Sequence, residues 1–273
     1  MAEPKVNPNG KLKGKVALVT GASRGIGEAI SVRLAMEGAK VVCTARTADA
    51  GESNLPGTLK DTIARIRKAG GEATFVKADL SSAADREQLV RDANAVYGPV
   101  DILVNNGAVT FYYPIETFPE KRFKLMMEVQ VWAAVHLAQM VLPHMREQKS
   151  GAIVTIASGA AIHPVKPYEN IRAGGTVYGM CKAALERFST GLASEVYNDN
   201  ISVNVISPGL VATPGVAVHG LINEKTKSRV APIENIAEAV YQLVSQDPKS
   251  IPGRVDHATP FLKEFNLEAS KLV

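Results

Sequence analysis

Residues 16–27 read VALVTGASRGIG, an apolar run followed at once by three glycines. The first five residues predict a buried strand, and glycines at 21, 25 and 27 permit a tight turn and a close approach of backbone to a ligand. The same glycines open a helix, whose free N–H groups and dipole favour a bound phosphate. Many turns between a strand and a helix carry glycines for packing alone. Three glycines in this register, after an apolar strand, instead predict dinucleotide binding.

Beyond this turn, apolar β-branched runs alternate with longer segments of helical period. Further strands are predicted at 40–44, 74–77, 102–105, 152–156 and 201–206, with a last short strand near 253–256. Helices are predicted at 25–37, 58–69, 83–97, 119–145, 175–198 and 233–245. Strands that are apolar throughout and separated by helices indicate a parallel sheet covered on both faces. The predicted fold is therefore α/β, a Rossmann fold with a doubly wound parallel sheet of about seven strands.

Length and composition fit one globular domain over residues 1–273, with a flexible N-terminal tail at 1–13 and a C-terminal tail at 258–273. No apolar run approaches the length of a membrane span, and the polar N-terminus lacks the apolar core of a signal peptide, so we expect a cytoplasmic protein. The net charge of +4 comes from dispersed basic residues, which gives no reason to expect nucleic-acid binding. Cys43 and Cys181 form neither a disulfide framework nor a metal cluster, so no metal is expected.

The end of the second strand, Cys43-Thr44-Ala45-Arg46, indicates the type of cofactor. An Asp or Glu there would bond the adenosine ribose 2′-hydroxyl, and none is present. Arg46 offers a planar cation suited to a 2′-phosphate, and Arg24 in the glycine turn can reach the same group. Surface arginines are common, but two of them with the acid missing favour NADP(H) over NAD(H). After the third strand, Asp79 either bonds the adenine amino group or caps the next helix.

Tyr178 and Lys182 stand four residues apart in the stretch YGMCK. Positions i and i+4 of a helix share one face, so the phenol and the ammonium would point into the same space. A nearby cation favours the phenolate and lowers the tyrosine pKa, and such a tyrosine can pass a proton to or from a substrate oxygen. The same spacing also arises by chance. The pair gains weight from the glycine turn and from Ser158 upstream.

In chain order, these motifs resemble those of the short-chain dehydrogenase/reductase family, over about residues 15–255. Residues 20–27 resemble its TGxxxGxG turn, and residues 105–108 (NNGA) resemble its NNAG segment with the last two residues exchanged. The remaining matches are the adenine-binding Asp79, the catalytic Ser158, the YxxxK pair Tyr178 and Lys182, the PG segment Pro208-Gly209, and Thr213, which would bond the nicotinamide carboxamide.

The resemblance implies a role for each of these residues. Tyr178 would be the general acid/base, Lys182 would lower its pKa and hold the nicotinamide ribose, and Ser158 would donate to the same substrate oxygen. The helix after the fourth strand and the helix around Tyr178 would pair subunits into a homodimer or homotetramer. The cofactor would contact Gly21, Ser23, Arg24, Gly25, Ile26, Gly27, Arg46, Asp79, Leu80, Asn106, Gly107, Tyr178, Lys182, Pro208, Gly209, Val211 and Thr213.

One departure from the family lies in the long helix after the fourth strand. The family usually has an asparagine there, which helps to hold a water that links the lysine to bulk solvent. Here Gln130 occupies the position, in the stretch EVQV. Glutamine has the same amide with one more methylene. Because Ser158, Tyr178 and Lys182 remain, we expect a slower proton relay rather than a dead enzyme.

Three further departures concern loops and the C-terminus. More residues separate Ser158 from Tyr178 than is usual, so part of 163–174 is an insertion that either shapes the substrate pocket or is a tolerated surface loop. The polar stretch 47–57 lengthens the connection after the second strand and gives a faint resemblance to the hydroxysteroid-dehydrogenase-like branch. Residues 255–258 read VDHA where the family has VDGG.

The sequence therefore predicts an oxidoreductase that transfers a hydride between NADP(H) and a small-molecule carbonyl or a secondary or primary alcohol. Apolar residues between 213 and 230 suggest a lipophilic substrate, although they would also serve simply to pack a lid. An alternative is a nucleotide-binding protein of the same fold, with catalysis weakened or lost at Gln130. A scaffold that binds no nucleotide is a third reading, disfavoured by the glycine turn.

Overall fold

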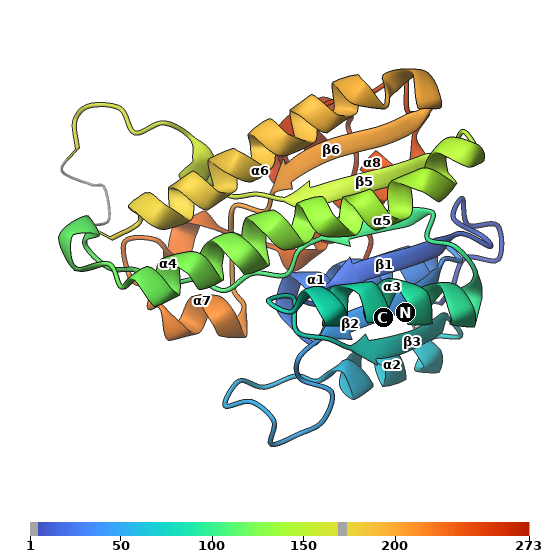
Figure 1. Cartoon of the computed structure of the whole chain (residues 1–273), viewed down its shortest axis with the longest axis horizontal. Coiled ribbons are helices and arrows are strands. Elements are labelled where there is room, and N and C mark those ends of the chain that lie inside the picture. Colours follow the sequence, from blue (N-terminus) through green and yellow to red (C-terminus); the bar gives the residue numbers. More distant parts are fainter. Residues whose placement is uncertain (1–4, 169–173, 273) are drawn as a thin grey trace.

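Seven parallel strands form the central sheet of the computed structural model, which describes residues 5–168 and 174–272 (Figure 1). From β1 the sheet extends one way to β2 and β3 and the other way to β4, which confirms the expected doubly wound Rossmann fold. The inner strands β1, β4 and β6 are wholly buried, as expected for a sheet covered on both faces, whereas the edge strands β3 and β9 are partly exposed. In spatial order they are β3 (Glu72–Lys77), β2 (Lys40–Ala45), β1 (Val16–Thr20), β4 (Ile102–Asn105), β5 (Gly151–Ile156), β6 (Ile201–Ser207) and β9 (Val255–His257).

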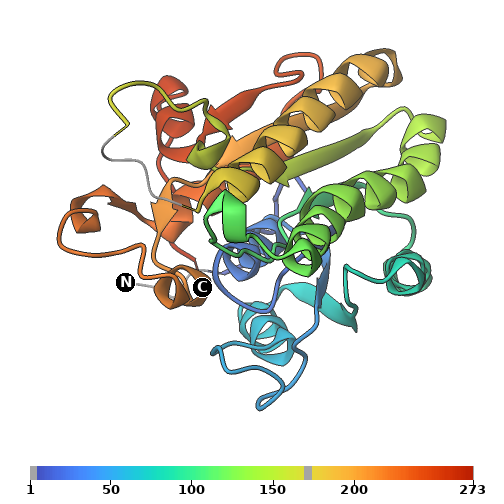
Figure 2. The ribbon, with the colours of Figure 1, turned by 60° about the vertical axis from the view of Figure 1, so that its left-hand side comes forward.

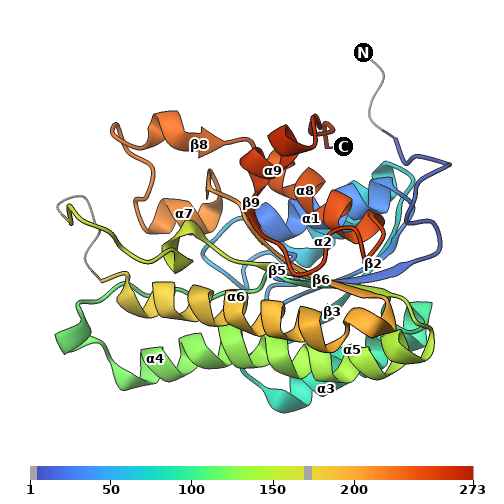
Figure 3. The same cartoon turned by 90° about the horizontal axis from the view of Figure 1, so that it is seen from above.

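Helices cover both faces of the sheet (Figure 3). One face carries α1 (Gly25–Met36), α2 (Leu59–Lys68), α8 (Ile233–Ser245) and α9 (Ala258–Glu264), and the other carries α3 (Ala83–Tyr97), α5 (Ala133–Glu147) and α6 (Thr176–Glu195). Each face has its own cluster of buried apolar side chains. The hydroxyls of Thr58 and Ser82 accept backbone N–H groups in the first turns of α2 and α3, which fixes where these helices begin.

The helix after β4 is longer and less regular than an ordinary α-helix. It runs as α4 (Glu120–Met126), a π-helical segment (Met127–Trp132) and then α5. Single π-helical turns are rare and are frequently found at functional sites, and this one contains Gln130.

The helix Glu120–Glu147 is also the one helix in the described residues that is long and apolar enough to cross a membrane, by length and composition alone. The expectation that no apolar run reaches that length therefore does not hold here. Side chains of this helix, such as Leu137 and Val141, pack in the core against α3 and the sheet. We therefore treat it as a helix of the folded domain.

A second, two-stranded sheet stands beside the carboxyl end of β6. It pairs β7 (Leu210–Val211) with β8 (Val230–Ala231) in parallel. The 18 residues between them, 212–229, include α7 (Pro214–Val218) and are called the lid below. Figure 2 shows the lid on the same side of the molecule as residues 157–168, which follow β5.

Both ends of the chain fold onto the face of the sheet that carries α1 and α8. The amide of Asn7 donates to the carbonyl of Met36 at 2.7 Å, and Leu12 is buried in the core. The expectation of a flexible tail over residues 1–13 was therefore wrong for residues 6–13, because backbone hydrogen bonds and an apolar anchor fix them; residues 1–4 lie outside the described residues. The C-terminal tail forms α9 and then packs Leu267 and Leu272 against the same core.

Candidate active site

The glycine turn lies beyond the carboxyl end of β1, where the strand order reverses. Gly21 and Gly25 have φ angles of +67° and +57°, in the left-handed region that favours glycine. A Cβ atom on Gly21 would lie 2.8 Å from Nδ2 of Asn106, and one on Gly27 would lie 2.3 Å from the carbonyl oxygen of Gly21. The turn therefore depends on glycine to bring its backbone against the segment after β4.

Thr20 ties the glycine turn to that segment. Its hydroxyl donates to the carbonyl of Val104 at 3.1 Å and accepts the backbone N–H groups of Asn106 and Gly107, each at 2.9 Å. The side-chain amide of Asn106 donates back to the carbonyl of Thr20 at 2.8 Å. These bonds place Asn106 and Gly107, both predicted to contact the cofactor, beside Gly21.

Ser158, Tyr178 and Lys182 come together where β5 ends and α6 begins. The hydroxyl of Ser158 is hydrogen-bonded to the phenol of Tyr178. Lys182 is only 4% exposed and donates to the carbonyl of Ile156 at 2.9 Å. Its Nζ lies 5.8 Å from the centroid of the Tyr178 ring. The three predicted catalytic side chains thus lie together in space.

Burial governs the ionisation of this group. It raises the pKa of the Tyr178 phenol, an effect that the hydrogen bond to Ser158 opposes without reversing. It lowers the pKa of Lys182 to about 8. The expectation that Lys182 lowers the pKa of Tyr178 does not hold in this structure, because the ammonium is directed at the Ile156 carbonyl and desolvation of the phenol outweighs the other effects. At neutral pH the group is a protonated phenol near a buried ammonium.

Gln130 faces Lys182 across a small buried cavity of about 10 Å³, which Asn105 also lines. Nε2 of Gln130 donates to the carbonyl of Val109 at 2.7 Å. Neither Oε1 of Gln130 nor Nδ2 of Asn105 has a hydrogen-bond partner among the described residues. Buried polar atoms are normally paired, and this volume is near the lower limit for one water molecule. Asn105 lies within the NNGA segment, but sequence reasoning did not select it.

Arg24 and Arg46 lie near each other at the end of β2. Burial, followed by the charge of Arg46, lowers the pKa of Arg24. The Arg24 guanidinium donates to the carbonyl of Gly57 at 2.7 Å and to the hydroxyl of Ser53 at 3.2 Å, so the long loop 47–57 holds it in place. Its Nε is buried and has no partner among the residues that the structure describes. Arg46 is exposed.

Asp79 and Leu80 border the glycine turn from the end of β3. One carboxylate oxygen of Asp79 accepts the N–H and the hydroxyl of Ser81, at 2.9 and 2.8 Å, while Ser82 caps α3. The alternative reading of Asp79 as the cap of that helix is therefore wrong. A Cβ atom on Gly107 would lie 2.5 Å from Cδ1 of Leu80, which explains a glycine at this position.

Residues 208–213 complete this end of the sheet. Gly209 has a φ of +75°, and Val211 is buried in β7. The hydroxyl of Thr213 accepts the N–H of Val216 at 3.2 Å, and a Cβ atom on Gly25 would lie 3.2 Å from the Thr213 side chain. Of the remaining predicted cofactor residues, Ser23 and Ile26 lie in the glycine turn and the start of α1, and Pro208 lies in the segment 208–213.

Two aromatic residues that sequence reasoning missed stand beside the catalytic tyrosine. The Tyr112 ring lies 5.8 Å from that of Tyr178, and the His219 ring lies 5.0 Å from that of Tyr112, measured between centroids. Neither residue belongs to a motif, so only proximity in the fold identifies them. The predicted insertion 163–174 borders this side of the site through Gly174, and its residues 169–173 lie outside the described residues.

Comparison with known proteins decides the family. Residues 15–220 match the short chain dehydrogenase family. The chain belongs to the short-chain dehydrogenase/reductase family. As such it is an NAD(P)-dependent dehydrogenase/reductase with a fold that binds a nicotinamide cofactor.

Relatives of this short-chain dehydrogenase/reductase span nearly its whole length. An uncharacterized oxidoreductase of Methylorubrum extorquens is 33% identical and aligns over 91% of this chain and 98% of its own. A short-chain dehydrogenase/reductase of Serratia marcescens has a TM-score of 0.78 at 32% identity, over 91% of this chain and 98% of its own. A metagenomic short-chain oxidoreductase in complex with NADP has a TM-score of 0.73 at 31% identity, over 90% of this chain and 97% of its own.

The residues present fit a nicotinamide dinucleotide. The N–H groups that open α1 are available to a pyrophosphate next to a glycine turn with the required backbone angles. The buried, unpaired Nε of Arg24 supplies a donor at the adenosine end. At the other end, the Thr213 side chain lies against Gly25 of the glycine turn, and Ser158, Tyr178 and Lys182 lie together beyond the end of β5.

Proposed function

We propose that this enzyme transfers a hydride between NADP(H) and a lipophilic carbonyl or alcohol, with Tyr178 as the general acid/base. The observation that carries the proposal is the hydrogen bond between the Ser158 hydroxyl and the Tyr178 phenol, next to buried Lys182. A carbonyl that accepts hydride becomes an alkoxide, which requires a proton and a polarising donor at one place. Two hydroxyls that already touch each other provide both.

The cofactor, when bound, supplies or accepts the hydride. Tyr178, protonated at neutral pH because burial raises its pKa, gives its phenol proton to the substrate oxygen during reduction. Ser158 donates a hydrogen bond to the same oxygen and stabilises its developing charge. Lys182 holds a positive charge close to the site and is placed by the carbonyl of Ile156. In oxidation of an alcohol the proton moves in the opposite direction.

Tyr178→Phe tests this function, because it removes the proton donor and keeps the ring. We expect carbonyl reduction to fall by at least about 100-fold, while the dissociation constant for NADPH changes little. The matched control is Tyr113→Phe on the neighbouring ring pair with Phe118. NADPH binding without turnover in the wild type, unaffected by Tyr178→Phe, would instead support the cofactor-binding reading with lost catalysis.

We propose NADP(H) over NAD(H) on the strength of Arg24 and Arg46. The metagenomic neighbour was solved in complex with NADP, and here Arg24 in the glycine turn is close enough to Arg46 after β2 to feel its charge, with no acidic residue at the strand end. Arg24→Gln and Arg46→Gln should each raise KM for NADPH by roughly tenfold and leave KM for NADH nearly unchanged, since one charge-assisted contact is lost. Equal effects on both cofactors would contradict a 2′-phosphate site.

We propose that Gln130 positions a proton-relay water next to Lys182. The unpaired Oε1 of Gln130 and Nδ2 of Asn105 face one cavity with Lys182 in its wall. A single water there would give both atoms a partner. The cavity is close to the smallest size that admits a water, and this supports a relay slower than in a roomier site.

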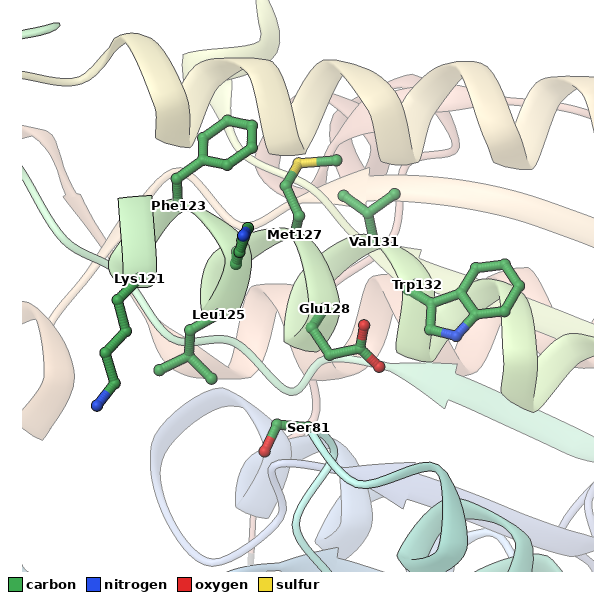
Figure 4. A pocket seen from close by; sticks show the side chains of 9 residues that line it. Ser81, Lys121, Phe123, Leu125, Met127, Glu128, Val131 and Trp132 are labelled. Atoms are coloured by element: carbon green, nitrogen blue, oxygen red, sulfur yellow. The ribbon is translucent and has the colours of Figure 1, made fainter. Parts of the chain in front are cut away.

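We also propose that this single-domain, cytoplasmic enzyme forms a homo-oligomer through α4, the π-helical segment and α6. A groove of about 750 Å³ runs along α4 and the π-helical segment and is lined by Phe123, Leu125, Met127 and Val131 together with charged side chains such as Lys121 and Glu128 (Figure 4). Trp132 is 45% exposed at one end of it. A second copy would cover these side chains, as members of the family are typically oligomeric. Sedimentation of the wild type and of Trp132→Glu tests this, and a wild-type monomer would refute it.

A further inference from the structure

We propose that Tyr112 and His219 form an aromatic wall that makes the enzyme select carbonyl substrates with a flat, aromatic substituent. The inference rests on the proposed function, because it concerns the substrate that Tyr178 protonates. It adds two specificity-determining residues, one from the loop after β4 and one from the lid. It also narrows the substrate from any lipophilic carbonyl to one with an aryl group near the reacting carbon.

The wall starts at the catalytic tyrosine and extends to the lid. The planes of Tyr112 and Tyr178 are tilted by 58° with their centroids 5.8 Å apart. His219 meets Tyr112 edge-on, at 78° and 5.0 Å. The three rings therefore form a continuous series in which each ring touches the next. A substrate whose oxygen is bonded to Tyr178 would extend past Tyr112 toward His219.

The backbone holds both wall residues in position from opposite sides of the site. His219 follows α7 directly, and its N–H donates to the carbonyl of Val216 at 3.2 Å. On the other side, Gly174 has a φ of +82°, and a Cβ atom on it would lie 2.9 Å from the backbone nitrogen of Tyr113. Any other residue at 174 would push against the chain that carries Tyr112. The wall is thus set by local backbone geometry and not by the ring contacts alone.

The packing around the catalytic ring at the start of the wall is apolar. Val109, Phe111 and Met127 pack with Tyr178 in one hydrophobic cluster. In the same cluster, the Arg122 guanidinium lies 4.4 Å from the centroid of the Phe111 ring. An uncharged, flat substituent suits such a site, because aromatic rings gain from tilted and edge-on contacts beyond the area they bury. A saturated ring of the same carbon number buries similar area without that gain.

Two ketones of matched size and reactivity test the wall: 4-phenyl-2-butanone and 4-cyclohexyl-2-butanone. The ring is remote from the carbonyl in both, so their intrinsic reactivities are alike. The measurement is the ratio of kcat/KM for the two ketones with NADPH. We expect the wild type to favour the phenyl ketone by about 2- to 12-fold, the range that an aromatic pair contributes. Tyr112→Leu and His219→Leu should each move the ratio toward one, whereas Tyr112→Phe should keep it.

The control is Tyr113→Leu, which removes the adjacent tyrosine that packs on Phe118 at 5.6 Å. It should leave the ratio unchanged. The dissociation constants of the two corresponding alcohols, measured by calorimetry with NADPH present, should show the same preference without turnover, because this pair contains no hydride acceptor. A wild-type ratio of one, or a ratio that neither leucine variant changes, would overturn the wall and leave the proposed function intact. Failure to reduce either ketone or 2,3-butanedione would overturn the proposed function and the wall with it.

Discussion

Shortening Gln130 to asparagine probes the link between the buried lysine and solvent. In the wild type, Nε2 of Gln130 donates to the carbonyl of Val109 at 2.7 Å, and its Oε1 faces the small cavity beside Lys182. Asparagine keeps the amide but withdraws it by one methylene. The hydrogen bond to Val109 is then lost, and the cavity grows by the space of that methylene, which gives the proposed relay water more room.

The cost in stability can be added up from these two changes. A lost hydrogen bond that leaves a buried carbonyl unpaired costs about 1 kcal/mol, and a buried methylene contributes about 0.8 kcal/mol. Gln130→Asn should therefore lower the free energy of unfolding by about 2 kcal/mol and lower Tm by about 4–8 °C. A water that enters the larger cavity and bonds the Val109 carbonyl would recover part of this loss.

Although the variant is less stable, its turnover should be faster. With more room for the water beside Lys182, the proton taken from Tyr178 is replaced faster, so the solvent deuterium isotope effect on kcat should fall and the pH profile of kcat should shift. Gln88→Asn, on the exposed face of α3, is the matched control and should change neither quantity. An unchanged turnover, isotope effect and pH profile in Gln130→Asn would refute any role of this position in proton transfer.

Three other outcomes follow from buried contacts. Burial lowers the pKa of Lys182 from about 10.4 in an unfolded chain to about 8, so between pH 8 and 10.4 the unfolded state binds more protons than the folded state. The wild-type free energy of unfolding should therefore rise relative to that of Lys182→Met by up to about 1.4 kcal/mol per pH unit across this range. A difference between the two proteins that does not change with pH in urea titrations would contradict this. Glu238→Gln should destabilise by about 3 kcal/mol in denaturant melts, since Arg33 loses a buried carboxylate at 2.7 Å and keeps only Glu37, whereas Glu224→Gln in an exposed pair should cost under about 1 kcal/mol. Leu12→Ala should cost about 2 kcal/mol if residues 6–13 are anchored as described, and no change in Tm would show them to be loose.

Much of the fold could be predicted from the sequence because buried parallel strands leave a strong pattern. β1 and β4 begin and end where their apolar runs do, and α3 and α8 match their periodic segments residue for residue. The two-residue strands β7 and β8 could not be predicted, since pairs of residues carry no periodicity. The π-helical segment was missed because its geometry depends on packing rather than on hydrophobic spacing. Docking of residues 6–13 depends on contacts with α1 that are distant in sequence.

For the site, the sequence motifs identified the catalytic residues but did not predict how the fold changes their pKa values. Ser158, Tyr178 and Lys182 do meet, as their order suggested. The direction of the tyrosine pKa was wrong, because the sequence shows that a cation is near but not where its ammonium points or how strongly the phenol is desolvated. Tyr112 and His219 belong to loops whose approach is set only by the completed fold.

The pairing of β7 with β8 has a consequence for how this protein can change. Leu210 pairs with Val230 and Val211 with Ala231, so the two ends of the 18-residue lid are tied together next to the sheet. The entropy of closing a loop grows only slowly with its length once the ends are joined. Segments of other lengths and sequences can therefore replace the part of the lid between Thr213 and Val230 at modest cost to folding, so that substrate preference can diverge while Thr213 and the rest of the cofactor site are kept.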